Sequence, residues 1–237
     1  MKPIDHVNEM EDQHRYDIHM SVGYGKEYRG EFDTSYRKLG TPVIKVYKSD
    51  VVEAVNNVAD EVGTAVLNFA SYNNPGGRFM SGSMAQEEAL CWSGTLYNVL
   101  RKYEDTYYAR NTTKKNRGLY TDSALYNPFV WVGKKRVAVI TCAAPNKSLL
   151  YRYGSFSEEQ NSKALESRIK YVLDVAEDNN VSTLFLGAWG CGVFKQNPHE
   201  VARLFKKYLQ SGVYGFNEVH FPITKNDEYE VFKEELL

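Results

Sequence analysis

Two short, nearly continuous apolar runs constrain the fold of this chain more than any other feature. Residues 64–70 read TAVLNFA and residues 136–142 read RVAVITC. Runs of this length and composition are typical of strands that are buried on both faces of a sheet. Helical segments alternate with such strands along most of the chain, which indicates βα units. We therefore expect an α/β fold with a mixed central sheet and helices on both of its faces.

The other predicted elements follow from local patterns after residue 42. Further strands are expected at residues 43–47, 184–186 and 216–223. Helices are expected from an N-cap at Asp50 to about residue 62, and at residues 86–103, 157–179, 197–209 and 227–237. Pro198 suits the first position of its helix. Residues 104–127 are polar and rich in tyrosine, so we expect them to run over the surface.

The N-terminal segment lacks such regular patterns. Residues 1–40 are polar, aromatic and weakly periodic, with loop signals at Tyr24-Gly25-Lys26 and Tyr28-Arg29-Gly30. A length of 237 residues is sufficient for one large domain. We predict that residues 1–40 are an N-terminal extension packed on a single domain formed by residues 41–237.

Charge and residue usage limit the classes of function. The net charge is -1 and the pI about 6.5, so no global positive field attracts nucleic acid. An anionic ligand would need local devices such as backbone amides and helix N-termini. Neither a secretory signal nor an apolar run of roughly 20 residues is recognisable, so we expect no membrane contact and a cytoplasmic location.

Cysteine and histidine usage adds two expectations. Cys91, Cys142 and Cys191 are far apart and form no CxxC pair, so we expect no disulfide partner and a reducing compartment. The five histidines form no HExxH motif and no pair with cysteine at metal-ligand spacing. We therefore expect neither a metal nor another cofactor.

The first candidate loop combines glycines with carboxylates. The segment 74–79 reads NPGGRF, and Gln86-Glu87-Glu88 opens the following predicted helix. Glycine lets the backbone approach a ligand closely. Each piece alone has an ordinary explanation, since Pro-Gly-Gly is common in turns and acidic residues favour the first turn of a helix.

The second candidate loop, residues 187–194, reads GAWGCGVF and lies between a buried strand and a helix. Its glycines suit a nest of backbone N–H groups around phosphate oxygens, although glycines at strand ends also serve helix–sheet packing. The order GxxGxG disfavours a Rossmann loop, and the Gly-Lys-Ser/Thr of a Walker A loop is missing from both segments. Together, the two loops suit a ligand with a central diphosphate and a terminal sugar.

At this point the residues resemble those of a known family. Four segments are similar, in order, to motifs of the microbial poly(ADP-ribose) glycohydrolases: NFASYNNPGGRF…AQEEALCWSGTLY, YTDSALYNP, VITCAAPN and FLGAWGCGVFKQNPHEVARLF. The resemblance runs from about residue 43 to residue 225. It implies a macrodomain-like three-layer sandwich that cleaves the O-glycosidic ribose bond of poly(ADP-ribose) or of ADP-ribosylated targets. The substrate would be ADP-ribose or its polymer, free or attached to protein or nucleic acid.

The resemblance also implies roles for the first loop. Gly76 and Gly77 match the first two glycines of the family's glycine triplet, and Gln86 begins its QEE motif. Glu88 would then be the catalytic acid/base, and Glu87 would fix the ribose. Because consecutive helical residues point about 100° apart, the two carboxylates cannot flank one bond, which agrees with one acid/base and one orienting group.

Further positions are implied as substrate contacts. Asn74 lies where the family's glycine loop approaches the ribose, and Phe194 would pack on that sugar. The backbone of the second loop would hold the diphosphate, through Gly190, Cys191, Gly192 and Val193. We interpret the Cys191 side chain as a small filler, since no histidine lies beside it in sequence to activate it.

Several alternatives remain open at this stage. Arg78 replaces the third glycine of the triplet, and its side chain either points away from the ligand or narrows the cleft, where it could contact a phosphate or the leaving group. Asp50 is a candidate for adenine binding or for a plain N-cap. The tyrosines of the 104–127 region and Tyr103 could stack on adenine or only line the surface. A non-catalytic ADP-ribose binding module is the alternative function, because only an enzyme needs Glu88.

Overall fold

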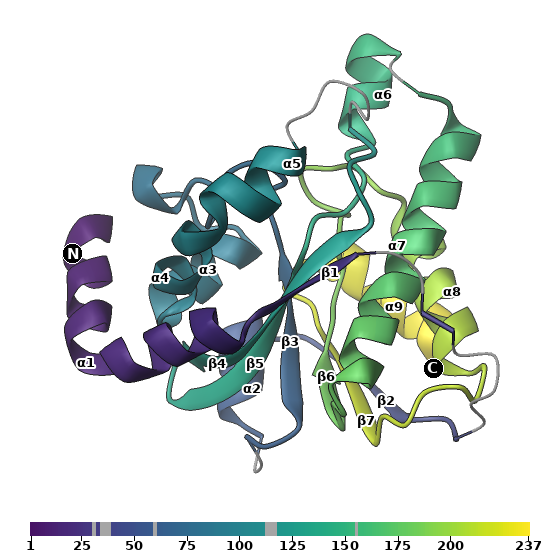
Figure 1. Cartoon of the computed structure of the whole chain (residues 1–237). Coiled ribbons are helices and arrows are strands. Elements are labelled where there is room, and N and C mark those ends of the chain that lie inside the picture. Colours follow the sequence, from purple (N-terminus) through teal and green to yellow (C-terminus); the bar gives the residue numbers. More distant parts are fainter. Residues whose placement is uncertain (30–31, 34–38, 59–60, 112–117, 155) are drawn as a thin grey trace.

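The computed structural model describes residues 1–29, 32–33, 39–58, 61–111, 118–154 and 156–237. Its described strands form one seven-stranded sheet in the order β1-β4-β5-β3-β6-β7-β2 (Figure 1). Their bounds are β1 (Lys26–Arg29), β2 (Val43–Tyr47), β3 (Thr64–Phe69), β4 (Ser123–Val132), β5 (Lys135–Cys142), β6 (Thr183–Phe185) and β7 (Glu218–Pro222). The ladder from β5 through β3, β6 and β7 to β2 is parallel, whereas β4 is antiparallel to both of its neighbours.

Helices cover both faces of this sheet. They are α1 (Pro3–Tyr24), α2 (Val51–Asn56), α3 (Gln86–Ser93), α4 (Leu96–Leu100), α5 (Ala109–Asn111), α6 (Ser148–Tyr153), α7 (Glu158–Asp178), α8 (Pro198–Leu209) and α9 (Asn226–Leu236). Short turns of helix occur at η1 (Phe79–Ser81), η2 (Arg101–Tyr103) and η3 (Glu104–Tyr108). Within the described helices, no stretch combines the length and apolar character needed to cross a bilayer.

Two hydrophobic cores, one on each face, hold the layers together. Ala65 and Leu67 of β3 point into the core under α7, α8 and α9. Val66, between them, points into the core under α1, α2, α3 and α4. Alternate residues of a strand face opposite sides of a sheet, so a strand buried on both faces must be apolar throughout. This arrangement confirms the predicted α/β class with a mixed sheet between two helical layers.

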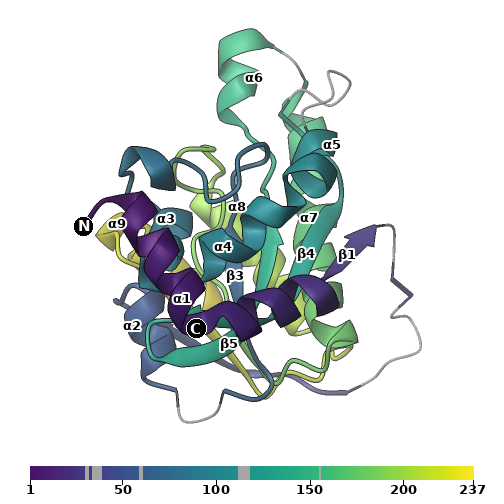
Figure 2. The same cartoon turned by 60° about the vertical axis from the view of Figure 1, so that its left-hand side comes forward.

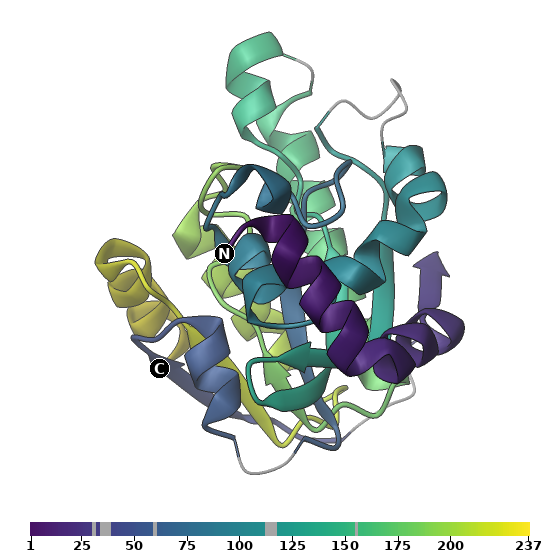
Figure 3. The same ribbon diagram turned by 90° about the vertical axis from the view of Figure 1, so that its left-hand side faces the viewer.

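The N-terminal segment is more regular than its sequence suggested. Residues 3–24 form helix α1, which bends at His14 and lies against α4 and β4 (Figures 2 and 3). The loop signal at Tyr28-Arg29 was misleading, because both residues belong to β1, which pairs with β4 at the edge of the sheet. The Tyr28 ring is buried, and its hydroxyl donates to Asn179 Oδ1 at 3.0 Å. Gly30 lies outside the described residues.

Two predicted helices are shorter than expected. Asp50 caps α2 as predicted, by accepting from the N–H of Glu53, but α2 ends at Asn56 rather than near residue 62. The predicted helix at 86–103 breaks after Ser93, where Gly94 forms a bridge with Val132. A Cβ at Gly94 would collide with the carbonyl of Trp131, so close approach to β4 takes precedence over a continuous helix.

The expectation that residues 104–127 run over the surface is wrong for most of the described part. Strand β4 already begins at Ser123. Tyr107 and Tyr108 are buried in the core under α1 to α4. Residues 112–117 lie outside the described residues. Helix α6 was not predicted either.

The topology gathers several loops at one edge of the sheet. The carboxyl ends of the parallel strands β3, β5 and β6 all lie at this edge, which is the upper edge in Figure 1. Since β4 runs the opposite way, its amino end lies there too. The segments concerned are residues 70–85, 118–122, 143–147 and 186–197. Ligands of α/β folds bind at this kind of edge.

Candidate active site

The glycine loop after β3 brings its backbone against two carboxylates. Gly76 and Gly77 have φ values of 66° and 61°, in the left-handed region that favours glycine. A Cβ built on Gly77 would lie 2.5 Å from Glu88 Oε1 and 2.9 Å from Glu87 Oε2. Glycine at position 77 is therefore required both by its conformation and by the space left beside the carboxylates.

The next residue, Arg78, has no such requirement. Its φ of -107° is accessible to any L-residue, and its side chain is exposed. Its backbone N–H donates to Glu88 Oε1 at 2.8 Å. The contact with the carboxylate therefore comes from the backbone, which explains physically how an arginine fits where the family pattern has a third glycine.

Glu87 is fixed by hydrogen bonds on both of its carboxylate oxygens. Asn68 Nδ2 donates to Oε1 at 3.2 Å, and the N–H of Ser71 donates to Oε2 at 2.7 Å. Only 3% of Glu87 is exposed. Burial raises the pKa of Glu87 to about 8, although the hydrogen bonds from Ser71 and Asn68 lower it. Glu87 is thus a rigid, buried group whose protonated form is favoured near neutral pH.

Glu88 has a different environment on the same first turn of α3. It is 6% exposed, and its Oε1 accepts from the N–H of Arg78. Among the described residues, Glu88 Oε2 accepts no hydrogen bond from the protein. One oxygen of Glu88 is therefore held in place, while the other has no hydrogen-bond partner among the residues that the structure describes.

Gln86 connects the start of α3 to the end of β3. Its Oε1 accepts from the N–H of Phe69 at 2.9 Å, and its Nε2 donates to the carbonyl of Leu67 at 2.8 Å. Both polar groups of this amide are engaged by the backbone of β3. Gln86 therefore sets the position of the two glutamates that follow it.

The loop after β6 presents backbone amides. Within the described part of the chain, six N–H groups of residues 187–194 donate no hydrogen bond, those of Gly187, Ala188, Gly190, Gly192, Val193 and Phe194. Gly190 serves packing, since a Cβ there would lie 2.9 Å from Ala144 Cβ. A Cβ on Gly192 would meet no atom within 4 Å, so packing within the protein does not require glycine at that position. This loop has the donors that an anion-binding nest needs.

Two buried residues, Gln196 and Asn161, hold the same loop in place. The N–H of Gln196 donates to the carbonyl of Gly190 at 3.0 Å, and the Gln196 side chain forms reciprocal hydrogen bonds with Asn161 of α7. The Cys191 side chain is buried, and burial raises the pKa of its thiol. Its environment is that of a packed filler rather than an activated nucleophile.

Aromatic rings bring the two loops together. Tyr72 of the glycine loop stacks on Tyr120, with ring centroids 4.2 Å apart and an interplanar angle of 12°. The Tyr120 ring lies 6.2 Å from that of Phe194, in the loop after β6. Gly187, at the start of that loop, approaches the Phe69 ring at the end of β3. The glycine loop and the amide-presenting loop therefore meet at one site.

The remaining candidates occupy varied positions. Asn74 is exposed, and its carbonyl accepts from the N–H of Gly77 at 3.0 Å, which closes the glycine turn. The carboxylate of Asp50 caps α2. Tyr107 and Tyr108 lie in a hydrophobic core, so of the tyrosine-rich stretch it is Tyr120 that reaches the loops.

Sequence reasoning did not identify three supporting residues. Tyr72, Asn68 and Ser71 contact the site through Tyr120 or Glu87. Asn68 lies within the apolar run that predicted β3, and Ser71 directly follows this run. A polar residue inside an apolar run is the signal that could have identified Asn68. All three cysteines are buried and free. Among the described residues, no group of three or more His, Cys, Asp or Glu side chains could hold a metal ion.

The chain is similar in sequence to one protein family and similar in structure to solved proteins of the same name. Residues 4–135 match the family described as microbial-type PARG, catalytic domain. The structure is similar to that of poly(ADP-ribose) glycohydrolase (PARG) from Deinococcus radiodurans in complex with ADP-ribose, with 30% identity, a TM-score of 0.82, and coverage of 92% of this chain and 96% of that one. A comparison with curated proteins gave no match.

The enzyme from Thermomonospora curvata gives similar values. Its structure bound to the inhibitor ADP-HPD has 29% identity and a TM-score of 0.80, and the match covers 92% of this chain and 87% of that one. Another structure of this enzyme has 28% identity and a TM-score of 0.77, with coverage of 92% and 88%. The similarity in structure therefore covers most of this chain, and the family match begins at residue 4.

Proposed function

The chain belongs to the microbial-type poly(ADP-ribose) glycohydrolase family, and we propose from this that Glu88 is its catalytic acid/base, supported by Glu87. The protein is a glycosidase that cleaves an ADP-ribosyl O-glycosidic bond. Its substrate is poly(ADP-ribose) or ADP-ribose attached to a target. In the related structure from Deinococcus radiodurans, ADP-ribose is the bound ligand.

The observation that carries this assignment is the difference between the two neighbouring carboxylates. Both oxygens of Glu87 accept hydrogen bonds from the protein, whereas Glu88 Oε2 has no such partner among the described residues. A general acid must exchange its proton with the reacting atoms, which requires an oxygen that the protein does not occupy. Glu88 therefore fits the acid/base role, and Glu87 fits the role of orienting the ribose.

The proposed reaction places the diphosphate on the amides of the loop after β6. The N–H groups of Gly192, Val193 and Phe194 would hold its oxygens, and Phe194 would pack on the terminal ribose. Protonated Glu88 would give its proton to the departing oxygen as the bond from the anomeric carbon breaks. A water molecule would then attack that carbon and return a proton to Glu88.

In this scheme a negatively charged group must stabilise the positive charge that develops on the ribose as the bond breaks. Glu87 does not provide this stabilisation from the opposite side of the sugar, because consecutive residues of one helix do not flank a bond. We propose that the diphosphate of the substrate stabilises the charge, since the amide-presenting loop would hold it and the rings of Tyr72, Tyr120 and Phe194 bring that loop close to the glycine loop. In this scheme the protein positions the substrate and supplies one proton-transfer group, Glu88.

The test is release of free ADP-ribose from an automodified poly(ADP-ribose) polymerase. Glu88→Gln should lower kcat by about 10²- to 10⁴-fold, the usual contribution of a general acid/base, and should still bind ADP-ribose. Glu159→Gln is the matched control, because Glu159 also lies in the first turn of a helix but is exposed. If the wild type binds ADP-ribose tightly and releases none from the polymer, the chain is a binding module instead.

A cytoplasmic location is part of the same proposal. Three buried cysteines that are all free are typical of proteins from reducing compartments. Cell fractionation with an antibody against the chain tests this point, and recovery of the protein outside the cytoplasmic fraction would contradict it.

A further inference from the structure

Tyr120 has a backbone conformation that its side chain disfavours. Its φ is 61°, in the left-handed region, although it is not glycine. It is also 6% exposed, so the ring is packed rather than free to turn in solvent. Residues with a Cβ keep such a conformation only where the surroundings enforce it, and such residues cluster at functional sites.

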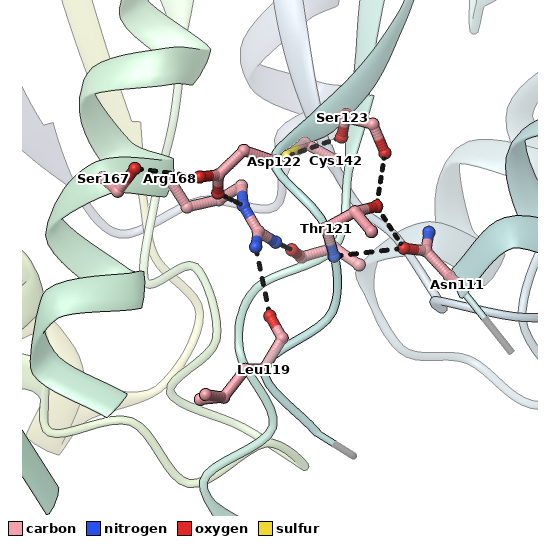
Figure 4. Close-up of polar contacts among 9 residues, drawn as sticks. Asn111, Leu119, Thr121, Asp122, Ser123, Cys142, Ser167 and Arg168 are labelled. Atoms are coloured by element: carbon pink, nitrogen blue, oxygen red, sulfur yellow. Dashed lines mark hydrogen bonds and ion pairs between the residues drawn. The ribbon is translucent and has the colours of Figure 1, made fainter. Parts of the chain in front are cut away.

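A buried arginine provides this enforcement. Arg168 of α7 is 2% exposed, and its guanidinium binds Leu119 and Asp122, which lie before and after Tyr120 in the chain (Figure 4). Nη2 donates to the carbonyl of Leu119 at 3.1 Å, and Nε donates to Asp122 Oδ1 at 2.5 Å. The planar guanidinium thereby fixes the residue before Tyr120 and the second residue after it.

Further contacts complete this clamp. Arg168 Nη1 donates to the carbonyl of Ala143, in the segment after β5, at 2.7 Å. Ser167 Oγ donates to Asp122 Oδ2 at 3.0 Å, and Thr121 Oγ1 donates to Asn111 Oδ1 at 2.7 Å (Figure 4). The segment that carries Tyr120 is therefore fastened to α7, to α5 and to the end of β5.

The Tyr120 ring in turn lies between the two loops of the site. One side stacks on Tyr72 at 4.2 Å between centroids, and Phe194 lies 6.2 Å away. These rings belong to the loops that carry the glycines and the backbone amides. A shift of Tyr120 would thus change the distance between the groups proposed to hold the diphosphate and those proposed to cleave the bond.

We propose that Tyr120 is a positioning residue for the reaction, and that the Arg168–Asp122 pair holds it there. Its ring acts as a spacer that keeps the ribose, anchored by its diphosphate, in register with Glu88. This inference rests on the proposed function, because it concerns how the same substrate is placed. Misplacement of reacting groups by about 1 Å lowers turnover by about 10²-fold, while the diphosphate contacts stay intact.

The test compares variants that separate the ring from the backbone conformation. Tyr120→Phe keeps the ring, whereas Tyr120→Asn removes it but keeps a residue that tolerates the left-handed region. With polymer as substrate, we expect kcat of Tyr120→Phe to stay within about threefold of the wild type, and kcat of Tyr120→Asn to fall at least about 10-fold. The KM and the Kd for ADP-ribose should change by less than about threefold in both.

A second variant tests the clamp without removing the buried arginine. Asp122→Asn keeps an oxygen acceptor for Arg168 but removes the charge of the pair. We expect an intermediate loss of kcat, again with little change in KM. Tyr16→Asn, at an exposed tyrosine of α1, controls for loss of a tyrosine as such and should leave kcat unchanged.

The outcomes separate this inference from the proposed function. Unchanged kcat in Tyr120→Asn, or a loss no larger than the loss of folded protein measured by circular dichroism, would overturn the positioning role. An equal loss in Tyr120→Phe would overturn it as well, because the ring would not be the relevant feature. If the wild type is active and Glu88→Gln is not, the proposed function stands whatever Tyr120 does. An inactive wild type overturns both.

Discussion

Gly77 and Glu88 are in such close contact that a Cβ on the glycine would lie 2.5 Å from Glu88 Oε1. The backbone of the glycine turn therefore packs directly against the carboxylate of the proposed acid/base, Glu88. The N–H of the next residue, Arg78, holds the same oxygen. Glu88 is thus positioned by backbone atoms, which adjust less than side chains do.

Gly77→Ala should therefore damage the site more than the fold. The left-handed φ of 61° costs a non-glycine residue about 1–2 kcal/mol, so the free energy of unfolding should fall by about that amount. In addition, the new methyl group must displace the carboxylates of Glu87 and Glu88. We expect kcat to fall by about 10²-fold, measured as release of ADP-ribose under saturating substrate.

Gly82→Ala is the matched control for this prediction. Gly82 also has a left-handed φ, of 79°, but a Cβ there would meet no atom within 4 Å. It should show a similar loss of stability and an unchanged kcat. Equal losses of kcat in the two variants would show that strain in the loop, rather than contact with the carboxylates, limits the activity.

The buried carboxyl of Glu87 predicts a pH-dependent stability. Its pKa is about 8 in the folded state and near the ordinary value of 4.5 in the unfolded chain. Between these values the folded state binds more protons, so its stability falls as pH rises through this window and levels off above about pH 8. Glu87→Gln cannot lose a proton. The Tm of this variant, relative to the wild type, should rise between about pH 5 and pH 9.

Asn68 makes a glutamine acceptable at this position. Asn68 Nδ2 donates to Glu87 Oε1, while Asn68 Oδ1 is buried without a hydrogen-bond partner among the described residues. A rotated Asn68 amide would present Oδ1 to the side-chain amide that Glu87→Gln introduces, so no donor need face a donor. A Tm difference that stays constant across this pH range would mean that Glu87 is already ionised at low pH.

His6 links the N-terminal helix to the helix that carries the glutamates. Its Nε2 lies 3.0 Å from the carbonyl of Cys91 and 3.2 Å from that of Gly94, so it must donate. His6→Leu would leave these carbonyls without this donor, which costs about 1–3 kcal/mol of unfolding free energy. Chemical denaturation measures this loss, and His6→Gln should restore part of it.

His19→Leu controls for the loss of a histidine on the same helix. His19 is exposed, so this change should be neutral within about 0.5 kcal/mol. If His6→Leu were equally neutral, α1 would contribute little to the support of α3. Residues 1–40 would then behave as an extension whose contacts the active site does not need.

The sequence predicted the parts of the fold that local patterns specify. The apolar runs became β3 and β5, and Asn197 with Pro198 began α8 as expected. Strand β4 was missed because Pro128 interrupts its pattern. The strand accommodates Pro128 where its register with β5 shifts, between Asn127 and Val130. Helix α1 was missed because polar contacts, such as those of His6, contribute to its docking.

In the candidate site, too, the residues that belong to local motifs could be predicted, whereas the contacts between distant segments could not. The resemblance to the glycohydrolase motifs implied the roles of Gly77 and Glu88, and the structure brings these two residues into close contact. The contact of Glu87 with Asn68 and the contacts of Arg168 with Leu119 and Asp122 could not be predicted. They join segments that are adjacent only after the sheet has formed, and no local pattern encodes them.

Arg78→Gly restores the third glycine of the family pattern and should have little effect on the chemical step. The φ of Arg78 is -107°, so glycine is not needed there, and the added freedom of the unfolded chain costs about 0.5–1 kcal/mol. The N–H that donates to Glu88 is retained. We expect kcat within about threefold of the wild type, together with a slightly lower Tm.

The same variant decides whether the Arg78 side chain contacts the substrate. This side chain is exposed and forms no hydrogen bond or ion pair within the described residues. If it binds a phosphate of the polymer, Arg78→Gly should raise KM for poly(ADP-ribose), and the increase should shrink as salt screens the charge. Arg78→Ala must behave alike, since it removes the same cation. A kcat lower by about 10-fold in both variants, at unchanged KM, would place the guanidinium in the chemical step instead.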